Sequence, residues 1–161
     1  MRILVAGRTG QLAASLAERA AERTDVELIC LGRPEFDKEK AALIAKPIEA
    51  RLPDLVINAA AYTAVDKAET EPERAFAINR DGDAAAARTA ANLGIPFVHL
   101  STDYVFDGRK EPPYVEVDGT APLSVYGRPK LEGERAVLQE HPQALILRTS
   151  WVFSPFGSNF L

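Results

Sequence analysis

The sequence predicts an α/β fold built on a doubly wound parallel sheet. Strand-like and helix-like segments alternate along its 161 residues. The strand-like segments are continuous apolar runs, which is typical of parallel strands that are buried on both faces. The first run ends in a glycine-containing turn that leads directly into a helix-like segment. Together these observations favour right-handed β–α–β crossovers within one sheet.

Each expected element has its own signal in the sequence. Strands are expected at the apolar runs of residues 2–6, 26–32, 54–61, 95–103 and 144–152. Helices are expected between them, at residues 11–23, 38–51, 71–92 and 126–140. Pro47 weakens or ends the second helix, whereas Pro72 and Gly94 mark the two ends of the alanine-rich third helix. The proline-containing segment from about Asp107 to Leu123 is expected to be a long loop of the kind that often carries function.

Composition excludes several classes of protein. The formal charge of −4 and the isoelectric point near 5.3 argue against a protein that binds nucleic acid or an anionic membrane surface. No apolar run has the length of a membrane span or the form of a secretory signal. Cys30 is the single cysteine and is expected to be a buried small side chain in a reducing compartment. Apart from Cys30, the potential zinc ligands of the nitrogen or sulfur type are only His99 and His141, so no structural zinc site is expected. Together these observations predict a cytoplasmic protein.

The turn after the first strand, 7-GRTGQLA-13, suits the phosphates of a dinucleotide. Gly7 permits a tight reversal, and Gly10 lets a diphosphate approach the helix N-terminus, where free N–H groups and the helix dipole favour an anion. Ala13 stands at the third small position, which serves close packing of the helix on the strand. A tight turn with a purely structural role is the alternative.

The end of the second strand indicates which dinucleotide is bound. An acidic residue there would bind the ribose 2′-hydroxyl of NAD, whereas arginine accommodates the 2′-phosphate of NADP. Gly32 stands where the acid would be and Arg33 follows it, so NADPH is the predicted cofactor and NADH the alternative. Asp37 and Lys38 lie on the next connection and are expected to reach the adenosine.

Two further strand ends carry candidate residues. The small residues 59–61 leave room for a ribose and nicotinamide to cross the edge of the sheet, although they could equally serve packing. Ser101, Thr102 and Asp103 emerge at the carboxyl end of the next strand. A hydroxyl there can hydrogen-bond the reacting oxygen of a substrate, with a strand cap as the alternative.

Tyr126 and Lys130 stand four residues apart at the start of the last helix. Residues at this spacing share one helix face, so the lysine would lower the pKa of the phenol from about 10. The pair could then transfer a proton to or from a carbonyl or carbinol oxygen. Pro129 lies between them and removes no hydrogen bond if the helix begins at about Tyr126. A solvated helix face is the alternative.

In their order along the chain, these segments resemble the dTDP-4-dehydrorhamnose reductases, which are extended short-chain dehydrogenase/reductases of Rossmann-type fold. The resemblance rests above all on AAAYTAVDKAE at 59–69, STDYVFDG at 101–108 and PLSVYGRPKLEGE at 122–134, and it extends over essentially the whole chain. Such enzymes use NADPH to reduce the 4-keto group of dTDP-4-dehydro-L-rhamnose. Their product, dTDP-L-rhamnose, is a precursor of bacterial cell-surface polysaccharide.

The resemblance implies a role for each matching residue. Tyr126 would donate the proton to the sugar C4 oxygen, Lys130 would lower the pKa of Tyr126 and bind the nicotinamide ribose, and Thr102 would share the reacting oxygen. Asn79 would support the site from the long helix. Asp103 and Trp151 would lie near the sugar nucleotide. Together with Gly7 and Arg33, the expected cofactor-binding residues are Gly10, Gln11, Leu12, Asp37, Lys38, Ala61, Tyr62, Thr63 and Leu100.

Chains of this family are much longer, and their C-terminal region holds most of the nucleotide-sugar site. Residues 1–161 are therefore expected to be a C-terminally incomplete Rossmann-type domain that keeps the cofactor side. Two other functions are open: a non-catalytic NADP-binding regulatory subunit related to these reductases, and another nucleotide-sugar reductase, epimerase or dehydratase. The resemblance also implies a homodimer, in some members with a magnesium ion at the interface, while the residues themselves indicate no metal site.

Overall fold

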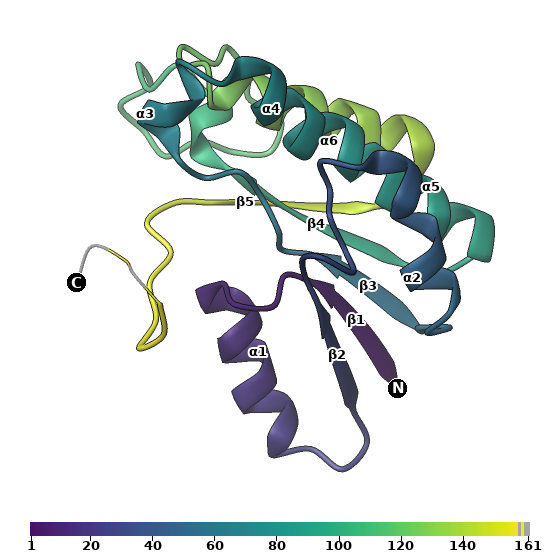
Figure 1. The fold of residues 1–161 in the computed structure, drawn as a ribbon. Coiled ribbons are helices and arrows are strands. Elements are labelled where there is room, and N and C mark those ends of the chain that lie inside the picture. The colour runs from purple at the N-terminus through teal and green to yellow at the C-terminus, as the bar shows by residue number, and fades with distance from the viewer. Residues whose placement is uncertain (158, 160–161) are drawn as a thin grey trace.

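The computed structural model describes residues 1–157 and 159, and it shows a parallel sheet between helices (Figure 1). The strands are β1 (Arg2–Ala6), β2 (Glu27–Leu31), β3 (Leu55–Asn58), β4 (Phe97–Thr102) and β5 (Leu145–Thr149). Their order in the sheet is β2-β1-β3-β4-β5, and every neighbouring pair is parallel. The predicted doubly wound α/β fold is therefore confirmed.

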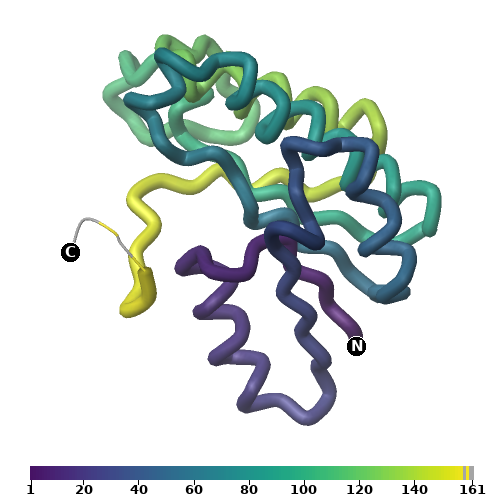
Figure 2. The backbone as a smooth tube through the Cα atoms, in the orientation of Figure 1, coloured from purple at the N-terminus to yellow at the C-terminus, as the bar shows by residue number. Residues whose placement is uncertain are grey.

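Helices lie on both faces of the sheet (Figures 1 and 2). They are α1 (Gln11–Ala21), α2 (Ala45–Glu49), α3 (Val65–Ala68), α4 (Pro72–Phe76), α5 (Gly82–Leu93) and α6 (Gly127–Glu140), with 3-10 turns η1 (Ala41–Leu43) and η3 (Asp103–Val105). One face carries α1, and the other carries α2, α5 and α6. The main core fills the space between the sheet and this second group, where Leu4, Val56, Phe97 and Val137 are buried. No helix in the described part of the chain is long and apolar enough to cross a membrane.

Several expected boundaries are corrected by the structure. Residues 38–40 are not helical, and Pro47 stands in the first turn of the short α2, where its missing N–H leaves no bond unmade. Pro129 likewise lies in the first turn of α6, which begins directly after Tyr126 as predicted. Cys30 on β2 is half-buried rather than buried, and this partial burial raises the pKa of its thiol.

The expected long helix at 71–92 contains a π-helical turn, η2 (Ala77–Asp81), between α4 and α5. Asn79 in this turn is fully buried. Its side chain accepts a hydrogen bond from the Tyr62 backbone N–H (2.8 Å) and donates one to the Tyr62 carbonyl oxygen (2.9 Å). Single π turns within α-helices occur frequently at functional sites. Here the turn attaches the segment that follows β3 to the helical layer.

Helix α6 packs against the π turn through Gly133. A Cβ atom at this position would lie 2.0 Å from the carbonyl oxygen of Asn79, so only glycine permits this approach. Lys130 and Tyr126 lie one and two turns earlier on the same face of the helix region. The close contact therefore brings both side chains to the carboxyl end of β4.

On the α1 side, β4 and β5 are not covered by any described helix. Val98 pairs with Leu145 and Leu100 with Leu147, so these four side chains share one face of the sheet. Leu145 and Leu147 are 53% and 40% exposed. Within the described residues, the sheet is thus closed on one face and partly open on the other.

We expect Gly133→Ala to lower the free energy of unfolding by about 1–3 kcal/mol, because the added methyl group collides with the Asn79 carbonyl and displaces α6. This loss outweighs the gain of about 1 kcal/mol that alanine brings to a helix interior. Urea unfolding followed by circular dichroism measures the change. Gly119→Ala is the matched control, because no atom lies within 4 Å of a Cβ built there. Equal stability of the two variants would disprove the close contact.

Candidate active site

A cleft of about 970 Å³ lies at the carboxyl ends of the strands. After β1 the chain passes to α1 on one face of the sheet, and after β3 it passes to helices on the other face. Ligands of open α/β sheets bind at such a switch in direction. The structure brings all the predicted site residues to this cleft, which is lined by Gly7, Gly10, Gln11, Leu12, Arg33, Asp37, Lys38, Ala61, Tyr62, Thr63, Leu100, Thr102, Asp103, Tyr126, Lys130 and Trp151.

The glycine turn forms one end of the cleft. Gly7 has a φ of 133°, which residues with a side chain rarely adopt. Gly10 precedes α1, and no side chain caps the N–H groups of Gln11, Leu12 and Ala13 in the first turn. Among the described residues, nothing lies within 4 Å of a Cβ built on Gly10. The turn therefore fits a diphosphate at the positive end of the helix.

Two arginines stand at the end of β2. Arg33 lines the cleft as predicted, and Arg8 of the glycine turn lines it as well. A Cβ built on Gly32 would lie only 2.9 Å from the Cβ of Arg8, so Arg8 occupies the space that an acidic side chain at position 32 would need. Sequence reasoning overlooked Arg8, although its place between two turn glycines was a signal. This end of the cleft fits a phosphate.

Lys38 lines the cleft, but its ammonium is bonded within the protein interior. Its side chain is buried, and its ammonium donates a hydrogen bond to the Ala60 carbonyl (2.5 Å) and pairs with the Asp83 carboxylate. Gly82 permits the close approach of the Lys38 backbone to α5, because a Cβ at position 82 would lie 2.5 Å from the Lys38 carbonyl oxygen. Asp37, the neighbouring residue, stays at the cleft with a side chain that is 17% exposed.

Tyr126 immediately precedes α6 and is 8% exposed. Its ring packs against α3 and α4 and meets the Tyr104 ring edge-on, with ring centres 5.4 Å apart. Burial raises the pKa of the phenol, and the Thr102 side chain only partly opposes this effect. The lowering of this pKa that was expected from Lys130 is therefore wrong for the protein without ligands. The phenol stays protonated at neutral pH, which is the form that donates a proton.

The Lys130 ammonium lies at the carboxyl end of β4. Its side chain is 2% exposed and donates a hydrogen bond to the Leu100 carbonyl (2.7 Å). Burial lowers the pKa of Lys130 from 10.5 to about 8, and the negative charge of Asp83 opposes that effect. Lys130 and Tyr126 both line the cleft.

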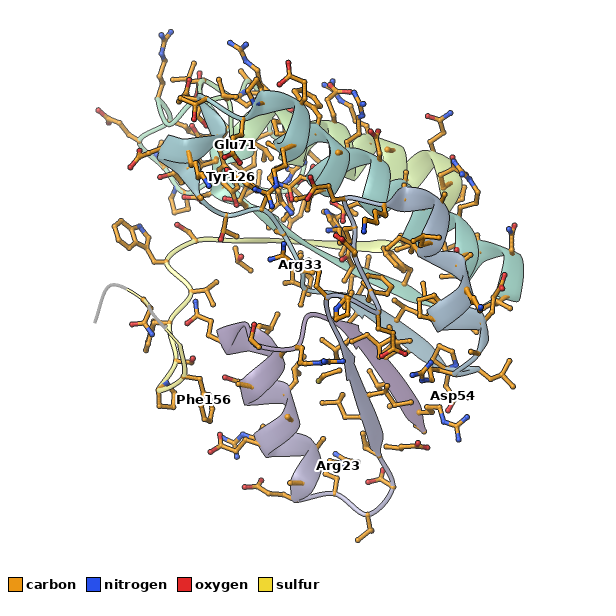
Figure 3. The ribbon with its side chains drawn as sticks, in the orientation of Figure 1. Arg23, Arg33, Asp54, Glu71, Tyr126 and Phe156 are labelled. Atoms are coloured by element: carbon orange, nitrogen blue, oxygen red, sulfur yellow. The ribbon has the colours of Figure 1, made fainter. Side chains whose placement is uncertain are left out.

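Polar groups continue from Thr102 towards the mouth of the cleft. The Thr102 hydroxyl donates to Asp103 (3.1 Å), and the second carboxylate oxygen of Asp103 accepts a hydrogen bond from Ser150 (2.7 Å). Trp151 is 75% exposed and has a φ of 54°, an uncommon conformation for a residue with a side chain. The chain then passes the start of α1, where Gln11 donates to the Val152 carbonyl (3.0 Å) (Figure 2). Arg33 and Tyr126 lie apart along the cleft (Figure 3).

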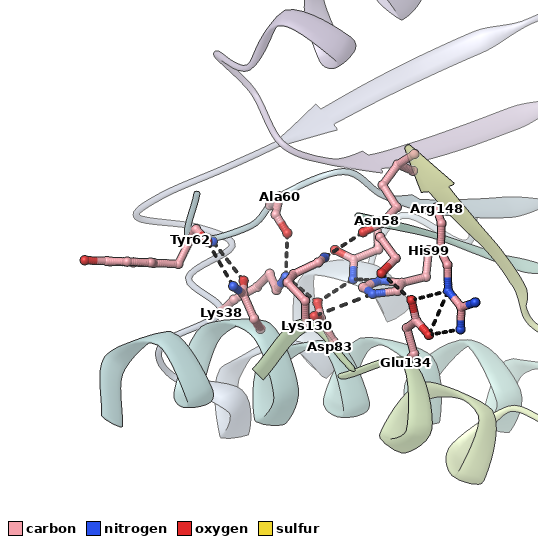
Figure 4. A network of polar contacts seen from close by, with 12 residues as sticks. Lys38, Asn58, Ala60, Tyr62, Asp83, His99, Lys130, Glu134 and Arg148 are labelled. Carbon is pink, nitrogen blue, oxygen red and sulfur yellow. Dashed lines mark hydrogen bonds and ion pairs between the residues drawn. The ribbon is translucent and has the colours of Figure 1, made fainter. Parts of the chain in front are cut away.

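A buried polar network lies directly behind the cleft (Figure 4). The Asn58 amide donates to Asp83 (2.5 Å) and lies 3.0 Å from Nδ1 of His99, so the His99 proton belongs on Nε2. Burial lowers the pKa of His99 from 6.5 to about 3, and the ring is therefore neutral at physiological pH. Nε2 faces the second oxygen of Asp83 at 3.9 Å. None of these three residues was predicted, because each lies in an apolar or alanine-rich segment.

Glu134 forms a second part of the network. It is 3% exposed, accepts a hydrogen bond from the Ser101 hydroxyl and pairs with Arg148 at 2.7 Å. Sequence reasoning missed this acid, although it stands four residues after Lys130 and thus on the helix face that carries Tyr126 and Lys130. Spacing alone could have found it.

No group of three or more His, Cys, Asp or Glu residues that could hold a metal ion occurs in the described residues. The described residues therefore give no support to the magnesium ion implied by the resemblance.

Because His99 is neutral in the folded protein, acid should favour the unfolded state. Its folded pKa of about 3 lies below the ordinary 6.5, so the stability linked to it is present above pH 6.5 and is lost as pH falls. Between pH 7 and 5, the free energy of unfolding should fall by about 2 kcal/mol more in the unmodified chain than in His99→Gln. Urea unfolding measures this difference. NMR at pH 5 should show a neutral ring with the proton on Nε2, and a charged ring would refute the assignment.

Comparison with known proteins agrees with the geometry. A family model described as "RmlD substrate binding domain" matches residues 1–161. The dTDP-4-dehydrorhamnose reductase of Sinorhizobium fredii is 56% identical over 161 residues, covering 100% of this chain and 54% of that protein. The Escherichia coli reductase is 41% identical over 162 residues, covering 99% of this chain and 54% of that protein. The chain thus spans about half the length of the curated relatives it matches.

Solved structures of the same group share the fold. The dTDP-4-dehydrorhamnose reductase of Bacillus anthracis in complex with NADP has a TM-score of 0.93 at 33% identity, covering 99% of this chain and 56% of that one. The Clostridium acetobutylicum reductase has a TM-score of 0.94 at 38% identity, with the same two coverages. The chain therefore belongs to the RmlD substrate binding domain family, and the resemblance to dTDP-4-dehydrorhamnose reductases is confirmed.

Proposed function

We propose that this chain provides the cofactor-binding and proton-donating side of an NADPH-dependent reductase that converts dTDP-4-dehydro-L-rhamnose to dTDP-L-rhamnose. The observation that carries this proposal is a single cleft that contains the glycine turn, two arginines and the Tyr126–Lys130 pair. The substrate is supported by the names of the relatives. The cofactor is supported by the NADP bound to the Bacillus anthracis reductase.

Different parts of the cleft would hold different parts of NADPH. The N–H groups at the start of α1 fit the diphosphate, and Arg8 with Arg33 fits the 2′-phosphate, because a guanidinium forms paired hydrogen bonds with phosphate oxygens. Asp37 would contact the adenosine. The nicotinamide end would be bordered by Ala61, Tyr62, Thr63 and Leu100.

When bound, NADPH supplies the hydride for the C4 carbon of the sugar. The Tyr126 phenol, kept protonated by burial, donates the proton to the C4 oxygen. The Thr102 hydroxyl orients that oxygen. The positive charge of Lys130, one helical turn away, stabilises the phenolate that remains on Tyr126 after the transfer.

Asp103 and Trp151 are proposed to contact the sugar nucleotide, since both line the cleft beyond Thr102. A non-catalytic NADP-binding subunit would need the phosphate end of the cleft but not Tyr126 and Thr102, so their presence in the same cleft favours a reductase. The proposal includes action in the cytoplasm, because the sequence has a single cysteine and no internal disulfide. The homodimer implied by the resemblance stays a prediction.

We expect Arg33→Ala to weaken NADPH binding by about 10- to 100-fold, because a charged hydrogen bond to the 2′-phosphate is lost. NADH binding should change by less than about threefold, since NADH lacks that phosphate. Fluorescence titration with both cofactors measures the two affinities, and Arg8→Ala should act in the same direction. Arg23→Ala is the control, because Arg23 pairs with Asp25 in the turn before β2. Equal losses for NADPH and NADH would remove the 2′-phosphate role.

Tyr126→Phe, made in the longest form of the protein that its gene encodes, should reduce turnover of dTDP-4-dehydro-L-rhamnose by about 10²- to 10⁴-fold through loss of the proton donor. NADPH affinity should stay within about twofold, because the phenyl ring keeps the packing against α3 and α4. Tyr104→Phe, at the neighbouring ring, is the control. Undiminished turnover would rule out the proton-donor assignment.

A further inference from the structure

Two lysines and one aspartate are buried together behind the cleft. Lys38, Asp83 and Lys130 are 4%, 0% and 2% exposed, and Figure 4 shows them in one network. They come from three separate parts of the chain: the loop after β2, the first turn of α5 and the start of α6. Buried charges are rare unless they are paired, so this arrangement requires an explanation.

Asp83 faces α6 because of Gly133. A Cβ built on Gly133 would lie 3.2 Å from Oδ2 of Asp83, which places this oxygen directly against the helix. Lys130 precedes Gly133 by three residues and projects from the same face. The carboxylate is thus the negative charge on α5 that faces the Lys130 side chain.

The two oxygens of Asp83 are used differently. Oδ1 pairs with the Lys38 ammonium and accepts the Asn58 amide hydrogen bond, whereas Oδ2 has no hydrogen-bond partner among the described residues. Lys38 is also held by the Ala60 carbonyl, so its ammonium is fixed on two sides. Asp83 is therefore anchored at one oxygen while the other remains beside α6.

Lys130 is held away from direct pairing with Asp83. Among the described residues, its ammonium donates a hydrogen bond to the Leu100 carbonyl, and no ion pair with Asp83 forms within 4.0 Å. An ammonium has three N–H donors, so two remain for groups in the cleft. Without Lys38, the strongest attraction on Lys130 would be the unpaired carboxylate behind it.

We propose that Asp83 and Lys38 are a positioning pair for Lys130. Asp83 supplies the buried counter-charge that holds the Lys130 ammonium at the carboxyl end of β4, and Lys38 satisfies the carboxylate so that Lys130 remains on the Leu100 carbonyl. The importance of this pair for catalysis rests on the role proposed for Lys130 above. The charge coupling itself rests only on the packing of α5, α6 and the loop that carries Lys38.

The other titratable groups around Lys130 are either paired with another residue or uncharged at neutral pH. Glu134 on α6 adds a smaller favourable charge and is itself paired with Arg148 on β5. His99 on β4 is neutral, and Tyr126 is protonated at neutral pH. Asp83 and Lys38 are therefore the pair whose removal should change the titration of Lys130 most clearly, and in opposite directions.

Lysine side-chain NMR on the 161-residue chain tests the proposal. With ¹³Cε-labelled lysine and the Lys130 signal assigned through Lys130→Arg, the titration midpoint of Lys130 should fall by about one pH unit in Asp83→Asn and rise in Lys38→Met. Lys40→Met is the matched control, because Lys40 is an exposed neighbour on the same loop, and it should leave the midpoint unchanged. Identical midpoints in all folded variants would show a purely structural pair and overturn the proposal.

If Asp83→Asn does not fold, the double variant Lys38→Met/Asp83→Leu removes both charges without leaving either one unpaired. A Lys130 midpoint below that of the unmodified chain supports the proposal, because Asp83 lies directly against α6, and an unchanged midpoint overturns it. NADPH titration of the same samples should show that affinity is lost as pH rises. In Asp83→Asn this loss should occur at a lower pH than in the unmodified chain. Failure of the unmodified chain to bind NADPH would contradict the proposed function alone, while the lysine titration would still decide the coupling.

Discussion

The contact between Gly133 and the carbonyl oxygen of Asn79 determines where the rest of the site lies. Because no Cβ separates them, α6 runs directly against the π turn and the first turn of α5. Lys130 and Tyr126 consequently reach the carboxyl end of β4. There they line the same cleft as the glycine turn that follows β1. The same close packing encloses Asp83, whose charge must then be compensated inside the protein. One packing constraint thus sets both the geometry and the electrostatics of the site.

Charges are distributed along the cleft according to what each end would bind. Arg33 and Arg8, which is paired with Glu35 at 3.7 Å, lie at the end of β2, where a phosphate fits. At the other end, burial keeps the Tyr126 phenol protonated and shields Lys130 from solvent. An acid that must give up a proton during reduction benefits from starting in its neutral form. Burial thus holds Tyr126 in the protonated form that a proton donor needs, although its pKa is raised and not lowered as the sequence predicted.

Much of the fold could be predicted from the sequence because its signals are local. Continuous apolar runs identify parallel strands, and Pro129 restricts where α6 can begin. The burial of Lys38 was not predictable in this way, because it depends on Gly82 and Asp83, which are distant in sequence and lie in an alanine-rich helix. The π turn at Asn79 was hidden for a similar reason, since its sequence pattern is that of an ordinary helix.

A crystal structure of this chain with NADP⁺ bound would test the central claim most directly. The account predicts the diphosphate on the first turn of α1, the 2′-phosphate between Arg8 and Arg33, and the nicotinamide ribose within hydrogen-bonding distance of Lys130. Tyr126 should then face the nicotinamide across the space for the sugar. A nicotinamide bound away from Tyr126 and Lys130, or NADP⁺ outside the cleft, would contradict the account.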